Sequence, residues 1–226
     1  MKARVNVEIL YEDEDILVVN KPSGMAVHAS SGHEEGSLVD VLLAHCPAMK
    51  GVGSEARSGV VHRLDMATSG VMVFAKNANA YRALREQFES HESVEKTYLA
   101  VVRGVPKERK GTIDAAIGRK AWDSKRMAVD GLQAKRAVTH WEVLSKKGGL
   151  ALIEFRIETG RTHQIRVHAA FMGHPIVGDE LYGDAAKERK AGRLLLHAVE
   201  LEFMHPRTHR RVKFAACPPR EIVYAC

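Results

Sequence analysis

Residues 138–157 read VTHWEVLSKKGGLALIEFRI, with the polar turn sequence KKGG at 146–149. Polar and apolar residues alternate over 138–144 and again over 150–157, which is the period of a half-buried strand. Two glycines between such segments are typical of a tight turn with positive backbone φ angles. The stretch therefore predicts a β-hairpin, the unit from which antiparallel sheets are built.

The rest of the chain adds short strands that outnumber the helices. Strands are predicted at residues 5–10, 15–19, 70–75, 97–102, 194–201 and 211–215. Helices are predicted at 38–45 behind the N-cap Ser37, after the cap Asn77 with a face of Ala80, Leu84 and Phe88, and over 162–172. Because hairpins join several of the strands, we predict an α+β fold with a mixed or mostly antiparallel sheet, and not a doubly wound one.

The composition is that of an ordinary globular domain. The chain has 226 residues, of which 45% are hydrophobic and 27% are charged, so we expect a single domain over residues 1–226. No stretch approaches the ~18 apolar residues of a membrane span, and the first residues have no apolar signal core. The three cysteines include no CxxC pair, which indicates a reducing, cytoplasmic location.

Positive charge is concentrated in one segment. The formal net charge is +6, and residues 103–136 hold ten Lys and Arg against four Asp and Glu. This excess suggests either a polyanionic partner or a solvated basic loop. A second, denser basic group consists of Arg207, Arg210, Arg211 and Lys213.

Several classes of binding site lack their sequence signature. No GxGxxG, GxxxxGK[ST] or GxSxG motif is present, so no nucleotide cofactor is expected. The pairs His163/His168 and His205/His209 do not suit a metal-binding helix, since the first has five-residue spacing and the second contains Pro206. The acidic residues 12–15 fit a turn better than a cation site. We expect neither a metal nor a cofactor.

Two motifs carry chemically useful side chains. In GVVHRLDMATSG, residues 59–70, Asp65 lies among hydrogen-bond donors and cations, as a functional carboxylate or as the acceptor of an Asx-turn. In TGRTHQIRVH, residues 159–168, a helix opening at Thr162 would place Arg166 on the same face as Ile165. A buried arginine needs an anion, for which Asp65 is a candidate; the alternative is an ordinary exposed arginine.

Three further segments are more ambiguous. Tyr98, in the segment EKTYL at 95–99, could stack on a nucleobase or lie in the core. The segments GHPIVGD at 173–179 and LLLHA at 194–198 are structural by default.

Taken in their order along the chain, these five segments together resemble the RluA-type family of pseudouridine synthases. HRLDMATSG at 62–70 is the most specific, and VVNKPSGM at 18–25 resembles the family's opening strand and loop. The likeness runs from about Val5 to about Pro219. It implies the pseudouridine synthase fold, with a long mixed sheet, flanking helices and a central catalytic cleft. With about four residues before the first strand, no separate N-terminal RNA-binding domain is expected.

The resemblance also implies residue roles. Asp65 matches the catalytic aspartate, Arg166 the arginine that pairs with it, and Tyr98 the tyrosine that stacks on the target uracil. Arg63 resembles a residue that enters the space left by the flipped nucleotide. The expected RNA-binding residues are His62, Arg63, Arg119, Lys120, Lys125, Arg126, Arg161 and His163.

The implied reaction is isomerisation of specific uridines in structured RNA, with no cofactor. We expect a monomer, because no extra element of the sequence needs a partner. The wording HRLDMATSG looks most like the RluA branch, whose members modify large-subunit ribosomal RNA, a transfer RNA anticodon stem-loop, or both. The alternatives are a tRNA-directed TruC-type synthase, a non-catalytic RNA-binding relative, and a glycosidase that admits water at the sugar.

Overall fold

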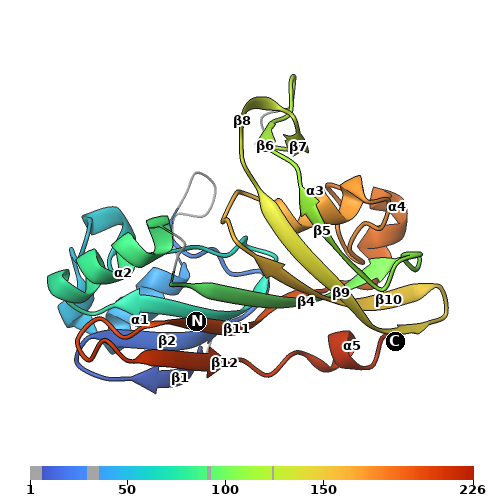
Figure 1. The fold of residues 1–226 in the computed structure, drawn as a ribbon. Helices are drawn as coiled ribbons and strands as arrows, with labels where there is room; N and C mark the ends of the chain where they lie inside the picture. The colour runs from blue at the N-terminus through green and yellow to red at the C-terminus, as the bar shows by residue number, and fades with distance from the viewer. Residues whose placement is uncertain (1–6, 30–35, 91–92, 124) are drawn as a thin grey trace. The chain divides into compact units, whose positions relative to one another are not determined.

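The computed structural model describes residues 7–29, 36–90, 93–123 and 125–226, which form two compact units (Figure 1). Unit 1 comprises Met1–Glu95 and Val199–Cys217, and unit 2 comprises Lys96–Ala198 and Pro218–Cys226. The expectation of a single domain stays a prediction. None of the helices formed by the described residues is both long and apolar enough to cross a membrane.

Unit 1 is built on an antiparallel sheet. β1 (Glu8–Glu12) pairs with β2 (Ile16–Lys21), which pairs with β3 (Ser69–Ala75). β3 is buried along its whole length, as its apolar sequence predicts. The later part of β11 (Leu196–Met204) pairs with β12 (Arg211–Ala215). The predicted strand 5–10 begins outside the described residues and continues to Glu12.

Two helices in unit 1 start where their caps predict. α1 (Leu38–His45) begins after Ser37, whose side chain forms a reciprocal capping box with Asp40. α2 (Ala78–Ser90) begins after Asn77, whose Oδ1 accepts from the backbone N–H of Ala80 at 2.9 Å. The predicted face of α2 is confirmed, since Ala80, Leu84 and Phe88 are its buried residues. Short 3₁₀ helices lie at Pro47–Met49 and Glu55–Arg57.

Unit 2 contains the predicted hairpin. β9 (Val138–Lys147) and β10 (Leu150–Ile157) pair around Gly148 and Gly149, whose φ angles are +58° and +77°. β10 also pairs with β4 (Glu95–Arg103), and β9 with β5 (Lys110–Asp114), so the order β4-β10-β9-β5 is antiparallel throughout. Strands and helices occur as the α+β prediction requires, and that prediction is confirmed.

The basic segment has more structure than its sequence predicted. β6 (Ile117–Arg119), β7 (Met127–Val129) and β8 (Leu132–Lys135) form a separate three-stranded sheet. Figure 1 shows these strands as a group beyond the ends of β5 and β9. The strands are three or four residues long, too short for sequence alternation to reveal.

The remaining helices of unit 2 are short. α3 (Gln164–Phe171) is two residues shorter at its start than predicted, because His163 has a left-handed φ of +58° and Thr162 lies in the turn before it. The expectation that Thr162 opens the helix is therefore wrong. α4 (Ala185–Glu188), a 3₁₀ turn at Arg189–Ala191 and α5 (Arg220–Val223) complete the unit.

Candidate active site

Asp65 lies on the loop that leads into β3. Asp65 is half-buried, and its chain neighbours are the buried Leu64 and the exposed Met66. A main-chain bond from Thr68 N–H to the Asp65 carbonyl, at 3.0 Å, closes the turn. The loop therefore holds a partly accessible carboxylate in a fixed backbone conformation.

The KPSG segment at residues 21–24 clamps this loop. The Gly24 N–H donates to the Met66 carbonyl at 2.8 Å, and Ser23 Oγ donates to the Ala67 carbonyl at 2.6 Å. Lys21 is fully buried, and its Nζ donates to the carbonyls of Pro22, Met25 and Met66 at 2.9, 2.8 and 3.1 Å. Because three carbonyls satisfy a buried ammonium group, Lys21 joins the opening motif to the residue that follows Asp65. Sequence reasoning missed this role.

His62 and Arg63, both predicted to bind RNA, lie differently. The His62 ring stacks on Phe88 with ring centroids 4.5 Å apart, and its Nε2 accepts from the Val73 N–H at 3.1 Å. Arg63 is exposed. The geometry gives His62 a structural task in joining the loop to β3 and α2, while Arg63 is available to a ligand.

Arg166 is buried, as its helical position predicts, and its anion is Asp179. Arg166 Nε and Nη2 each donate to one oxygen of Asp179 at 2.8 Å. Asp179 Oδ1 also accepts from the N–H groups of Leu181 and Tyr182. The ion pair fixes the guanidinium plane through two of its five donors. The further pairing of Arg166 with Asp65 stays a prediction.

Tyr182 connects three parts of unit 2. Its ring centroid lies 5.2 Å from Arg166 Cζ, a distance suited to a cation–π contact. Its hydroxyl accepts from the Met127 N–H at 2.9 Å and bonds with His163 Nδ1 at 2.8 Å. His163, predicted to bind RNA, thus lies at the junction of α3 and the three-stranded sheet.

The other polar residues of TGRTHQIRVH anchor α3 from within. Gln164 Oε1 accepts from Thr159 Oγ1 and from the Arg161 N–H, and Gln164 Nε2 donates to Thr139 Oγ1. His168 bonds with Thr139 Oγ1 at 2.8 Å and with the Ala115 carbonyl at 3.0 Å. Burial lowers the pKa of His168, against the opposing effect of the Ala115 carbonyl. Much of this motif therefore positions α3.

Tyr98 is buried in β4, opposite Phe155 of β10. Lys96, two residues earlier and on the same face of the strand, is also buried. Burial, with a smaller contribution from Arg161, lowers the pKa of Lys96 to about 8. A buried lysine with a lowered pKa is a feature of this strand that the sequence did not reveal.

The predicted RNA-binding cations of unit 2 gather near the three-stranded sheet. Within the described parts of the chain, Arg119, Lys120 and Lys125 have no carboxylate within ion-pair distance, while Arg126 pairs with Asp123 at 3.4 Å. Arg161 Nε donates to the Arg136 carbonyl. These side chains leave an exposed positive surface.

The second basic group is different, because carboxylates accompany most of it. Arg207 pairs with Glu14 and Asp15, Arg211 with Glu95 and Glu202, and Lys213 with Glu200 and Glu202. The sequence interpretation of this group as a dense positive cluster is therefore incomplete, since strand pairing and the β1–β2 turn bring acids to it.

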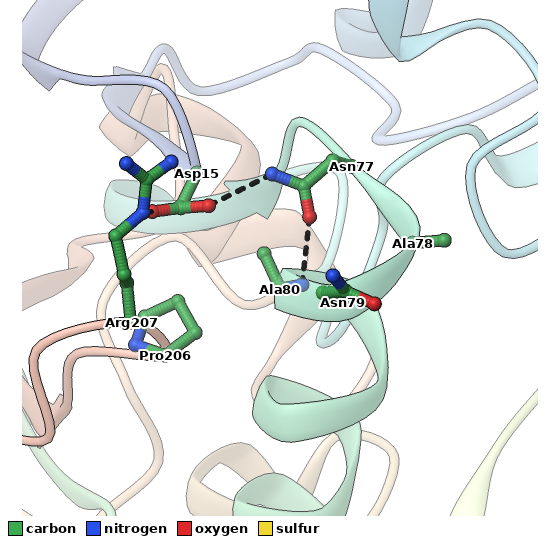
Figure 2. Close-up of a pocket in the computed structure, with 7 residues that line it drawn as sticks. All are labelled: Asp15, Asn77, Ala78, Asn79, Ala80, Pro206 and Arg207. Carbon is green, nitrogen blue, oxygen red and sulfur yellow. Dashed lines mark hydrogen bonds and ion pairs between the residues drawn. The ribbon is translucent and has the colours of Figure 1, made fainter.

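One acidic cluster has the composition of a metal site. Ligand atoms of Asp13, Asp15 and His205 lie within 4.8 Å of one another. His205 Nε2 bonds with Asp13 at 2.8 Å, while Asp15 is held between Arg207 and Asn77, beside a cavity of about 510 Å³ (Figure 2). Protein partners account for these atoms, in keeping with the turn expected for residues 12–15.

Comparison with known proteins identifies the chemistry to which this arrangement belongs. A family model described as RNA pseudouridylate synthase matches residues 15–171. The chain belongs to the RNA pseudouridine synthase family. The match includes Asp65, Tyr98 and Arg166, and it confirms the family that the motifs predicted.

Relatives of this chain come from several bacteria. It is 45% identical over 218 residues to an uncharacterized RNA pseudouridine synthase of Bacillus subtilis, covering 96% of this chain and 71% of that protein. It is 42% identical over 228 residues to ribosomal large subunit pseudouridine synthase D of Zymomonas mobilis, with coverage of 96% and 71%. An uncharacterized RNA pseudouridine synthase of Synechocystis is 43% identical over 206 residues, covering 89% of this chain and 62% of that protein. The chain thus spans 62–71% of the length of these relatives.

Solved structures agree with the family. Human RNA pseudouridylate synthase domain containing 1 has a TM-score of 0.79 at 30% identity, with coverage of 98% of this chain and 86% of that one. Human RNA pseudouridylate synthase domain containing 4 has a TM-score of 0.74, also at 30% identity, with coverage of 96% of this chain and 90% of that one. The predicted pseudouridine synthase fold, with its long, mostly antiparallel sheet, is confirmed.

Proposed function

We propose that this chain converts uridine to pseudouridine in large-subunit ribosomal RNA. The observation that carries the proposal is Asp65, which lies within the matched region on a loop clamped by Lys21 and Ser23. The name of the Zymomonas relative supports the choice of RNA. A transfer RNA anticodon stem-loop is the other substrate to be tested, and we further propose that the enzyme acts in the cytoplasm as a monomer.

The reaction requires an ionised carboxylate. Pseudouridine formation breaks the N1–C1′ bond of uridine, turns the base and joins it again through C5, so atoms are conserved. A carboxylate could attack C1′, add to C6 of uracil, or remove a proton from C2′. Asp65 is the proposed carboxylate, and Arg166 is the proposed cation that favours its charged form.

The target base must leave its stack before it reaches the carboxylate. Flipping costs a few kcal/mol, and stacking on an aromatic ring returns about 1–3 kcal/mol. Tyr98 is the proposed stacking ring, and Arg63 the residue that occupies the space left behind. The other side chains that we propose to contact the RNA are Arg, Lys and His residues, which can bind phosphates or bases: His62, Arg119, Lys120, Lys125, Arg126, Arg161 and His163.

One assay tests the proposal against its alternatives. Unmodified large-subunit ribosomal RNA, and separately a transfer RNA transcript, is prepared with tritium at uracil C5 and incubated with the enzyme. A synthase releases tritium to water and leaves the strand intact. Release of free uracil would identify a glycosidase, and no release from either RNA, despite binding, would identify a non-catalytic relative. Release from transfer RNA alone would overturn the proposed substrate and leave the reaction standing.

A further inference from the structure

Among the described residues, Trp122, between β6 and β7, is the most exposed large hydrophobic residue. Its relative exposure is 105%, and its backbone has a left-handed φ of +63°. A non-glycine residue in this conformation is strained, and a fully hydrated indole gains nothing from packing. Both costs fall on one residue, which favours a ligand-binding role.

Hydrogen bonds hold described residues on both sides of Trp122. The Lys120 N–H donates to the Arg126 carbonyl at 2.9 Å, and the Asp123 N–H donates to the Lys120 carbonyl at 3.3 Å. The Lys125 N–H donates to Asp123 Oδ1 at 3.1 Å. Because these bonds fix the backbone on both sides, the indole is presented to solvent before any partner binds, which reduces the entropy cost of binding.

The surroundings of Trp122 are positively charged. Arg119, Lys120 and Lys125 flank it without carboxylate partners among the described residues. At the base of the same sheet is a cavity of about 270 Å³, whose lining includes Arg119, Lys135 and Arg161 and no Asp or Glu. An aromatic ring among cations is the arrangement by which proteins hold single-stranded nucleic acid, with bases on the ring and phosphates on the cations.

We propose that Trp122 stacks on an unpaired base of the substrate RNA while the surrounding cations bind the flanking phosphates. The proposal rests on the proposed RNA substrate. The hairpin is tied to the Arg166 region, because the Met127 N–H at its base donates to the Tyr182 hydroxyl. A base held by Trp122 is therefore held in a defined register relative to Arg166, which makes Trp122 a specificity-determining residue.

Fluorescence tests the contact directly, because Trp122 and Trp141 are the two tryptophans of the chain. In Trp141→Phe, emission reports on Trp122 alone. The probes are a single-stranded RNA of twenty nucleotides and the same RNA in a duplex. Stacking predicts quenching of the emission by the single strand and little change with the duplex. An equal change with both probes, or none with either, would overturn the proposal.

Affinity measurements provide a second test, in the chain that keeps Trp141. Stacking worth ~1–3 kcal/mol predicts that Trp122→Ala binds the single strand about 5- to 150-fold more weakly. Trp122→Phe should recover most of this loss, since it keeps an aromatic face. The matched control is Tyr224→Ala, an aromatic residue of the same unit that is 75% exposed. An alanine variant that binds as tightly as the wild type would disprove stacking, whatever the tritium assay reports on the proposed reaction.

Discussion

Both carboxylate oxygens of Asp179 accept hydrogen bonds from Arg166, and the two side chains are only 0% and 8% exposed. They are 13 positions apart in the chain, so the partner of Arg166 comes from the GHPIVGD segment. The sequence predicts a structural role for this segment. Its aspartate has such a role, since it orients a residue proposed to act in the reaction.

Removing the Asp179 charge should affect both stability and activity. Breaking a buried ion pair from one side typically costs about 3–5 kcal/mol, because the remaining charge is left uncompensated. We expect Asp179→Ala to lose stability of this order in urea denaturation. Asp179→Asn, which keeps a hydrogen-bond acceptor, should fold better and still lose turnover in the tritium assay. Wild-type turnover in both variants would show that the orientation of Arg166 is unimportant.

Asp65→Asn should abolish turnover and leave RNA binding within a few-fold of the wild type. The substitution keeps the size of the half-buried side chain. It removes the negative charge that all three carboxylate routes to pseudouridine require. Tritium release and filter binding on the same RNA measure the two effects. Appreciable pseudouridine formation by this variant would contradict the assignment of Asp65.

Lys21→Met should loosen the loop that carries Asp65. The variant removes the ammonium donor from the Met25 carbonyl, while the Met66 carbonyl keeps the bond from the Gly24 N–H. An unsatisfied buried polar group costs about 1–3 kcal/mol. We expect a loss of stability in this range and a lower kcat. Ser23→Ala, which removes the shorter bond to Ala67, is the milder comparison. Equal kcat values in the wild type and Lys21→Met would show that the clamp does not position Asp65.

Lys96 should make stability rise with pH on the alkaline side. Burial lowers its pKa in the folded state from 10.5 to about 8, so between these values the unfolded chain binds more protons than the folded one. Stability then increases with pH across this window, by at most about 3 kcal/mol at 1.36 kcal/mol per pKa unit. Urea denaturation from pH 7 to 10 should show the wild type gaining stability relative to Lys96→Met. Parallel profiles would contradict the lowered pKa.

Short-range features were the most predictable from the sequence. Ser37 and Asn77 cap their helices, Gly148 and Gly149 form the hairpin turn, and Arg166 is buried. In each case the controlling interaction lies within a few residues or follows from helical or strand periodicity. The start of α3 was predicted wrongly, because Gln164 bonds back to Arg161 and Thr159 and so stabilises a turn before the helix.

The sequence by itself determined the family, because HRLDMATSG is a specific local motif, and that motif supplies Asp65 as the proposed carboxylate. Only the tertiary structure decided which side chains support the site: Asp179 for Arg166, and Lys21 for the Asp65 loop. Lys21 and Met66 are 45 residues apart in the chain. Contacts of that kind depend on how strands pack and which groups lose water together, and no local spacing encodes them.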